Sequence, residues 1–253
     1  MRVVIFKKFS LILASLIFIE IPHLNKTFWL ATLCALPLEI STIILYTKAL
    51  KVSPLSLTVP FLALTPLFLI FTSYLILGEK VSFSGSIGIL LIAAGSYTLN
   101  IHKVRQSLID PIKATFKEKG SVMMIIVAFI FSITSSLGKM AIENSSPVFF
   151  GSFYFLLITF LFTPIAMAKN KNKIAITKKD IITLIPIGIT YSLMIICHMY
   201  AMSLTKVAYM ISVKRTSLLF SIFYGYIIFK EEKISERLAG SIIMLAGFVI
   251  IVL

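Results

Sequence analysis

Long apolar runs constrain the fold of this chain more than any other feature of its sequence. About nine runs approach the roughly 20 residues that a helix needs to cross a bilayer. Hydrophobic residues make up 58% of the chain and charged residues 13%, far from the usage of soluble domains. Cys34 and Cys197 both lie inside apolar runs, so neither a disulfide framework nor a metal site is suggested. The sequence predicts an all-α, polytopic membrane protein.

Proline and glycine positions predict local features of the expected helices. Pro37 is expected to kink the second helix, and Pro60 and Pro66 to loosen the third. Gly88 and Gly95 in the fourth helix and Gly240 and Gly247 in the last have the spacing of close helix contacts. The expected helices cover residues 1–22, 27–50, 54–77, 83–100, 119–142, 147–168, 180–204, 207–229 and 235–253.

The two halves of the chain repeat each other. Tyr46-x-x-Ala49-Leu50 resembles Tyr200-x-x-Ser203-Leu204, and each motif precedes a long apolar run. The division predicts a first repeat of four helices (1–104), a cytoplasmic connector (105–118) and a second repeat of five helices (119–253). Equivalent loops then fall on opposite faces of the membrane, so the repeats are inverted. Such repeats are typical of secondary transporters.

Lysine and arginine predict the orientation. The net charge of +14 lies mainly between apolar runs, where membrane topology explains it better than nucleic-acid binding does. One face of the nine-helix arrangement receives only Lys26, Lys80 and Lys206, and the other receives nearly all remaining cations. The second face is therefore expected to be cytoplasmic, together with the amino terminus of this chain.

Two adjacent cations interrupt the apolar stretch 207–229. Lys214 and Arg215 lie about a third of the way along it, at a depth where charge is costly and marks functional positions. Lys214, Ser217, Ser221 and Tyr224 recur at helical spacing on one face of a continuous helix. The favoured interpretation is that the cations line a water-filled cavity; the alternative is that both extend to the membrane surface.

Other polar residues in apolar runs complete the candidate substrate-binding set. Glu39 either neutralises a buried cation or handles substrate or protons. Lys139 is a candidate cavity cation, or it pairs with Glu143 one helical turn away. His198 is either a proton site or a hydrogen-bonded interior residue. The set consists of Lys214, Arg215, Lys139, Glu39, His198 and Tyr200, and Thr58, Thr65 and Thr72 add a polar stripe at heptad spacing in the third helix.

Several motifs in this order resemble the EamA-type drug/metabolite transporter superfamily. They are Tyr46-x-x-Ala49-Leu50, Ser53-Pro54-Leu55-Ser56-Leu57, Leu77-Gly78-Glu79 and, in the second half, Leu137-Gly138-Lys139 before Ser145-Ser146-Pro147. The resemblance implies ten helices in two inverted halves of five around a central cavity. This chain then reads as an amino-terminally shortened member that lacks the first helix. Well-studied relatives keep both termini in the cytoplasm, whereas the charges here place the carboxyl terminus outside.

The Lys214-Arg215 pair is also similar to a pair in the triose-phosphate and nucleotide-sugar translocator branch. There the pair holds substrate phosphate, which implies the same role here. That branch also uses a lysine from the first half, and the run 54–77 contains none.

These observations predict a secondary transporter that moves a small, anionic metabolite across the cytoplasmic membrane by alternating access. The expected partners are the solute, the lipid bilayer and either protons or a counter-transported solute, with no cofactor and no nucleic acid. The alternative is a non-transporting membrane subunit or an inactive truncated fragment of such a transporter. A membrane enzyme is less favoured because no His-Glu-x-x-His or comparable motif occurs.

Overall fold

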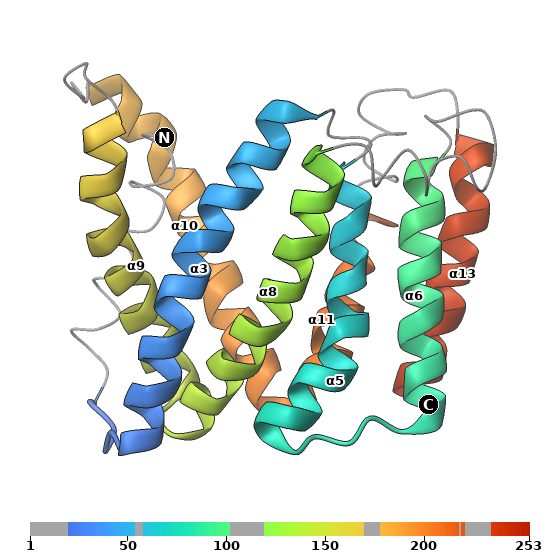
Figure 1. Ribbon diagram of the computed structural model, residues 1–253, viewed down its shortest axis with the longest axis horizontal. Helices are drawn as coiled ribbons and strands as arrows, with labels where there is room; N and C mark the ends of the chain where they lie inside the picture. The colour runs from blue at the N-terminus through green and yellow to red at the C-terminus, as the bar shows by residue number, and fades with distance from the viewer. Residues whose placement is uncertain (1–19, 54–57, 102–118, 170–177, 218, 221–233) are drawn as a thin grey trace. The chain divides into compact units, whose positions relative to one another are not determined.

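The computed structural model describes residues 20–53, 58–101, 119–169, 178–217, 219–220 and 234–253 (Figure 1). These residues form eight α-helices and one 3-10 helix, with no strand among them, which confirms the predicted all-helical class. The elements are α3 (Lys26–Val52), η1 (Val59–Leu64), α5 (Thr65–Leu77), α6 (Phe83–Ile101), α8 (Lys119–Glu143), α9 (Pro147–Lys169), α10 (Lys178–Leu204), α11 (Val207–Arg215) and α13 (Ile234–Val252).

The helix predicted over 54–77 is divided in the structure. Residues Val59–Leu64 form a 3-10 helix, and an α-helix follows from Thr65 to Leu77. Pro60 and Pro66 are the second residues of these two elements, within the first turn, where the missing amide N–H costs no helix hydrogen bond. Pro37, by contrast, lies inside the continuous helix α3. The predicted run 1–22 lies almost entirely outside the described residues, and the connector 105–118 lies wholly outside them.

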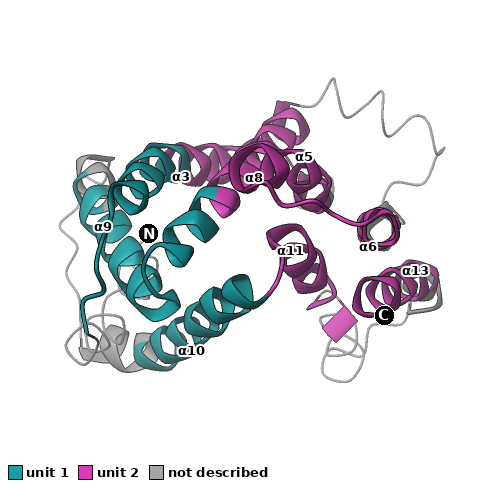
Figure 2. Ribbon diagram, turned by 90° about the horizontal axis from the view of Figure 1, so that it is seen from below, with its two compact units in different colours: residues 1–40, 137–204 teal, residues 41–136, 205–253 magenta. Residues whose placement is uncertain are grey.

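The chain divides into two compact units (Figure 2). Unit 1 contains residues 1–40 and 137–204, and unit 2 contains residues 41–136 and 205–253. The continuous helices α3 and α8 each contribute one end to either unit. Each unit therefore draws residues from both predicted repeats, and the repeat boundaries remain a prediction.

Aromatic side chains form the core of unit 1. Phe28 of α3 is fully buried, and its ring lies 6.1 Å from that of Phe149 and 6.3 Å from that of Phe150 on α9. Asn25 caps α3, because its Oδ1 accepts a hydrogen bond from Phe28 N at 2.9 Å. The Nδ2 of the same Asn25 side chain donates to Asn144 Oδ1 at 2.6 Å. Helix α9 is thus packed against the beginning of α3.

Glycine contacts join α6 and α13 in unit 2 (Figure 1). The sequence predicts close contacts at these glycines, and the structure shows which two helices make them. A Cβ added at Gly88 would lie 2.7 Å from the Gly247 carbonyl oxygen. A Cβ added at Gly95 would lie 2.6 Å from the Gly240 carbonyl oxygen. Any larger residue would push the two backbones apart, so these positions require glycine. Ile92 and Met244 are fully buried in the same contact.

Several residues of the sequence motifs define helix ends in unit 2. Ser53 Oγ accepts a hydrogen bond from Gly120 N at 3.2 Å, at the beginning of α8. Ser82 Oγ accepts one from Gly85 N at 3.0 Å, which caps α6. Gly78 ends α5 in the left-handed region, with φ of 69°. The helix ends that these residues form therefore explain why serine or glycine occurs at each position.

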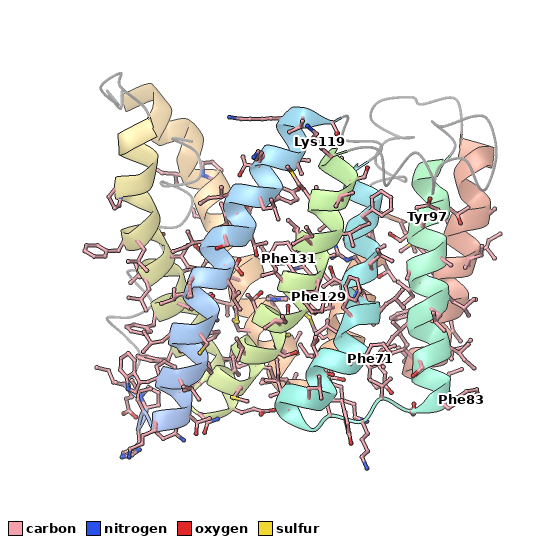
Figure 3. All side chains as sticks on the ribbon, in the orientation of Figure 1. Phe71, Phe83, Tyr97, Lys119, Phe129 and Phe131 are labelled. Carbon is pink, nitrogen blue, oxygen red and sulfur yellow. The ribbon has the colours of Figure 1, made fainter. Side chains whose placement is uncertain are left out.

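Large apolar side chains lie exposed on the helices of both units. Leu75 is 79% exposed and Phe160 78%; Phe71 on α5 and Phe83 at the beginning of α6 are also exposed (Figure 3). Apolar surface on this scale is typical of a protein that is covered by lipid or by a partner. Among the described helices, Lys26–Val52 and Lys119–Glu143 are long and apolar enough to cross a membrane, and several others carry shorter apolar stretches.

Candidate functional site

The amino-terminal end of α11 is attached to the turn between α5 and α6. Glu79 of this turn accepts a hydrogen bond at Oε2 from Val207 N, at 2.9 Å. Lys206 Nζ donates to the Lys80 backbone oxygen at 2.7 Å. A carboxylate at this position satisfies one of the amide groups that a helix leaves unpaired and complements the positive end of the helix dipole. The turn therefore fixes where α11 begins.

Tyr209 provides a second attachment of α11 to the same turn. Its hydroxyl accepts a hydrogen bond from Ser82 N at 3.0 Å and lies 2.9 Å from Ser82 Oγ. Lys206 Nζ lies 5.6 Å from the centroid of the Tyr209 ring, within cation–π range. Contacts at Glu79 and Lys80 and contacts at Ser82 thus both fix the orientation of α11 relative to the turn.

Helix α11 ends at Arg215 and helical residues resume at Ser217, so the helix predicted over 207–229 is interrupted at Thr216. Thr216 Oγ1 donates to the Val213 carbonyl oxygen at 2.6 Å, and Leu219 N donates to the Thr216 carbonyl oxygen at 2.9 Å. Bonds over three residues are typical of a tight 3-10 turn, and a threonine hydroxyl that bonds back competes with the helical pattern. The predicted polar face cannot be followed further, because Ser221 and Tyr224 lie outside the described residues.

Lys214 and Arg215 occupy the last turn of α11. Cations are stabilised there by the negative end of the helix dipole and by carbonyl groups without helical partners. The Lys214 side chain is exposed, and Arg215 is half-buried. The end of the helix thus offers a local reason for two adjacent cations at this depth, which the sequence pattern alone does not provide.

Arg215 is held by a residue from the first half of the chain. Its Nη2 donates to Thr65 Oγ1 at 3.3 Å, and Thr65 is 2% exposed. Tyr46 also interacts electrostatically with Arg215. Arg215 Nε is buried and has no hydrogen-bond partner among the described residues. No acidic residue that the structure describes forms an ion pair with Lys214 or Arg215.

The threonine stripe of the third predicted helix is buried. Thr58 is fully buried, Thr65 is 2% exposed and Thr72 is 7% exposed. Thr72 Oγ1 donates to the Phe68 carbonyl oxygen of its own helix at 3.1 Å. Thr65 instead accepts a hydrogen bond from the cation on α11. Thr72 therefore forms a hydrogen bond within its own helix, whereas Thr65 connects two helices.

Lys139 is buried in unit 1 and has an acidic partner on its own helix. Its side chain is 7% exposed, and Nζ lies 3.8 Å from Oε1 of Glu143, whose side chain is 51% exposed. The predicted pairing within the helix is confirmed. This contact gives Lys139 a structural explanation that needs no solute.

Glu39, His198 and Tyr200 lie in unit 1. Glu39 is half-buried and interacts electrostatically with Tyr154 and Tyr191. His198 is half-buried on α10, and Tyr200 is 49% exposed near the end of that helix. The compensation of a buried cation by Glu39 and the proton role of His198 remain predictions.

The structure brings together part of the predicted set and adds residues to it. In unit 2 it joins Arg215 to Thr65, and in unit 1 it joins Lys139 to Glu143 and Glu39 to two tyrosines. The sequence singled out Thr65 by its spacing, but not as a contact of Arg215. It gave no signal that Glu79 caps α11. Among the described residues, no group of three His, Cys, Asp or Glu side chains could hold a metal ion.

Comparison with known proteins identifies the family to which this chain is similar. The model of the EamA-like transporter family matches residues 3–101 and 118–253. A crystal structure of another protein, 14% identical, aligns with a TM-score of 0.74 over 99% of this chain and 87% of that chain. At this identity the likeness shows the fold alone. No match was found among the curated proteins.

The match covers most of both halves of the sequence, and the described secondary-structure elements are all helices with extensive exposed apolar surface. The chain therefore belongs to the EamA-like transporter family, whose members are polytopic membrane proteins that transport small solutes.

Proposed function

We propose that this protein is a secondary transporter that moves a small anionic metabolite across the cytoplasmic membrane by alternating access. The observation that carries the proposal is the Lys214-Arg215 pair, which has no acidic partner among the described residues. A cation inside a membrane protein needs a compensating group, and a solute anion supplies one during transport.

The chemistry of the pair favours solutes that carry phosphate or carboxylate. Arginine presents a planar fork of N–H donors that matches two oxygens of such a group, whereas lysine supplies a compact point charge. Lys214 is exposed and Arg215 has a buried Nε. We assign to Lys214 the attraction of the anion and to Arg215 its orientation.

The interruption of α11 at Thr216 supports the same location. The break is local, because Thr216 keeps helical backbone angles, with φ of −63° and ψ of −13°, and helical residues resume at Ser217. Transporters bind solutes at breaks in membrane helices. The predicted residues Glu39, His198 and Tyr200 are kept as candidates for binding or coupling, whereas Lys139 is assigned a structural role because it pairs with Glu143. Protons or a counter-transported solute would provide the driving force.

Uptake into proteoliposomes tests the proposal. Arg215→Lys keeps the charge and loses the planar fork, so we expect uptake of phosphorylated or carboxylated solutes to fall about tenfold. Lys214→Gln should reduce it through lost attraction. Lys119→Gln, which removes an exposed cation at the beginning of α8, is the matched control and should leave uptake unchanged. Preference of the wild-type protein for cations, or indifference to both substitutions at normal expression, would reject the proposal.

The proposed orientation has a separate test. Cys34 and Cys197 are exposed free cysteines, so both must first be replaced. A single cysteine is then introduced at Lys113 or Ala175, in the two predicted cytoplasmic loops. The positive-inside rule predicts labelling from the cytoplasmic face alone. Labelling of either position from outside intact cells would reverse the proposed orientation.

A further inference from the structure

We infer that Thr65 is a positioning residue of the anion site, which fixes the plane of the Arg215 guanidinium for the recognition of an oxyanion. The inference rests on the proposed function and extends it to the shape of the group that is recognised. It assigns different tasks to the two cations: Lys214 attracts anions in general, and Arg215 selects those with two suitably placed oxygens.

The donors of Arg215 carry the first step. A guanidinium has five N–H donors in a fixed plane and remains charged in proteins. Thr65 takes a donor on Nη2, at 3.3 Å. Nε is buried without a hydrogen-bond partner among the described residues. A buried donor left unpaired is unfavourable, and the adjacent donors of the fork suit two oxygens of one carboxylate or phosphate.

The setting of Thr65 carries the second step. Thr65 is 2% exposed and lies where η1 ends and α5 begins. Its β-branched side chain has few accessible rotamers, and Pro66 restricts the next backbone position. Helix α5 packs against α11 in the same unit. The hydroxyl is therefore a fixed acceptor, and it restricts the plane in which the guanidinium lies.

The site should consequently prefer oxyanions to spherical anions. A halide is attracted by the charge of either cation but cannot bridge two donors of the fork as a planar or tetrahedral oxyanion does. Loss of the Thr65 hydroxyl would keep both charges and release the orientation of Arg215. The expected change is therefore in selectivity, more than in the attraction of anions as a class.

Binding of methylphosphonate and of chloride to the purified full chain in detergent tests the inference, at constant ionic strength. Thr65→Val removes the hydroxyl and keeps the shape, so we expect the Kd for methylphosphonate to rise about fivefold and that for chloride to stay within twofold. Thr65→Ser should restore methylphosphonate binding. Thr72→Val is the matched control, because the Thr72 hydroxyl bonds to its own helix, and it should bind both anions as the wild type does.

The outcomes separate this inference from the proposed function. Wild-type binding of methylphosphonate that Thr65→Val leaves unchanged would overturn the role of Thr65 and keep the anion site. Equal weakening of methylphosphonate and chloride by Thr65→Val, or the same loss in Thr72→Val, would mean that the hydroxyl acts on packing alone. No binding of methylphosphonate by the wild type, together with no uptake of phosphorylated or carboxylated solutes, would overturn the proposed function itself.

Discussion

Lys139 and the Lys214-Arg215 pair are both cations in apolar helices, yet their surroundings differ. Lys139 lies in unit 1 with Glu143 one turn away on the same helix, at 3.8 Å. The pair in unit 2 ends its helix, contacts Thr65 and has no acidic partner among the described residues. The charge of Lys139 is thus compensated by a carboxylate on its own helix. The charges of Lys214 and Arg215 are stabilised by the helix dipole and by the Thr65 hydroxyl.

This difference separates a structural cation from a candidate binding cation. A neutral hydroxyl and the end of a helix dipole stabilise a positive charge without cancelling it. The region around Arg215 therefore keeps its attraction for an anion, whereas Glu143 reduces that of Lys139. Two cations within apolar helices therefore need not have the same role.

The largest expected effect comes from neutralising the two sites separately. Arg215→Met should lower kcat/KM for oxyanion uptake about 100-fold, because it removes a charged contact made to the solute. Lys139→Met should change it less than about threefold, because methionine fills a similar volume and the pair is internal. Proteoliposome uptake at matched protein density measures both. Equal losses in two well-folded variants would break the comparison.

Substitution of Glu39 is a second test of the comparison between Lys139 and the Lys214-Arg215 pair. If its carboxylate compensates a buried cation, Glu39→Gln should destabilise the protein by about 1–3 kcal/mol, measured by denaturation in detergent. Combining it with neutralisation of the true partner, Lys139, Lys214 or Arg215, should recover part of that loss. Strict additivity with all three would refute the pairing of Glu39 with a cation.

Loss of the contact between Glu79 and α11 should have a smaller effect on uptake. It should disturb the site at Arg215 and leave the site at Lys139 unchanged. Glu79→Ala removes the acceptor for Val207 N and should cost about 1 kcal/mol, with a fall in uptake of about fivefold as the end of α11 shifts. Glu79→Gln keeps an acceptor oxygen and should lie closer to the wild type. An unchanged uptake in Glu79→Ala at normal stability would show that the position of Arg215 does not depend on this cap.

The smallest effect is expected at Glu143. Its side chain is 51% exposed, and an ion pair of this kind contributes less than about 1 kcal/mol. Glu143→Gln should therefore leave uptake unchanged and lower the midpoint of thermal denaturation only slightly. A marked gain in anion binding would instead show that Glu143 keeps Lys139 from acting as a second anion site.

Much of the fold could be predicted because its signals are local. Apart from the third and eighth, the predicted helices within the described residues begin and end within two residues of the observed ones. Their ends are set by short-range features such as Ser82, Gly78 and the prolines. The glycine contacts of α6 and α13 also followed from spacing. The eighth helix could not be predicted as observed, because apolar composition does not show that the helix is interrupted at Thr216.

The sequence by itself determined that this chain is a helical membrane protein of a transporter family, since apolar runs, charge distribution and helix signals act over short distances. It also offered the pairing of Lys139 with Glu143 as one of two interpretations, because that pairing depends on helical spacing alone. Only the tertiary structure decided that Thr65 holds Arg215, 150 residues away, and that Glu79 caps α11 at Val207, 128 residues away. Such contacts depend on how separate helices pack, and no local pattern records which side chains packing brings together.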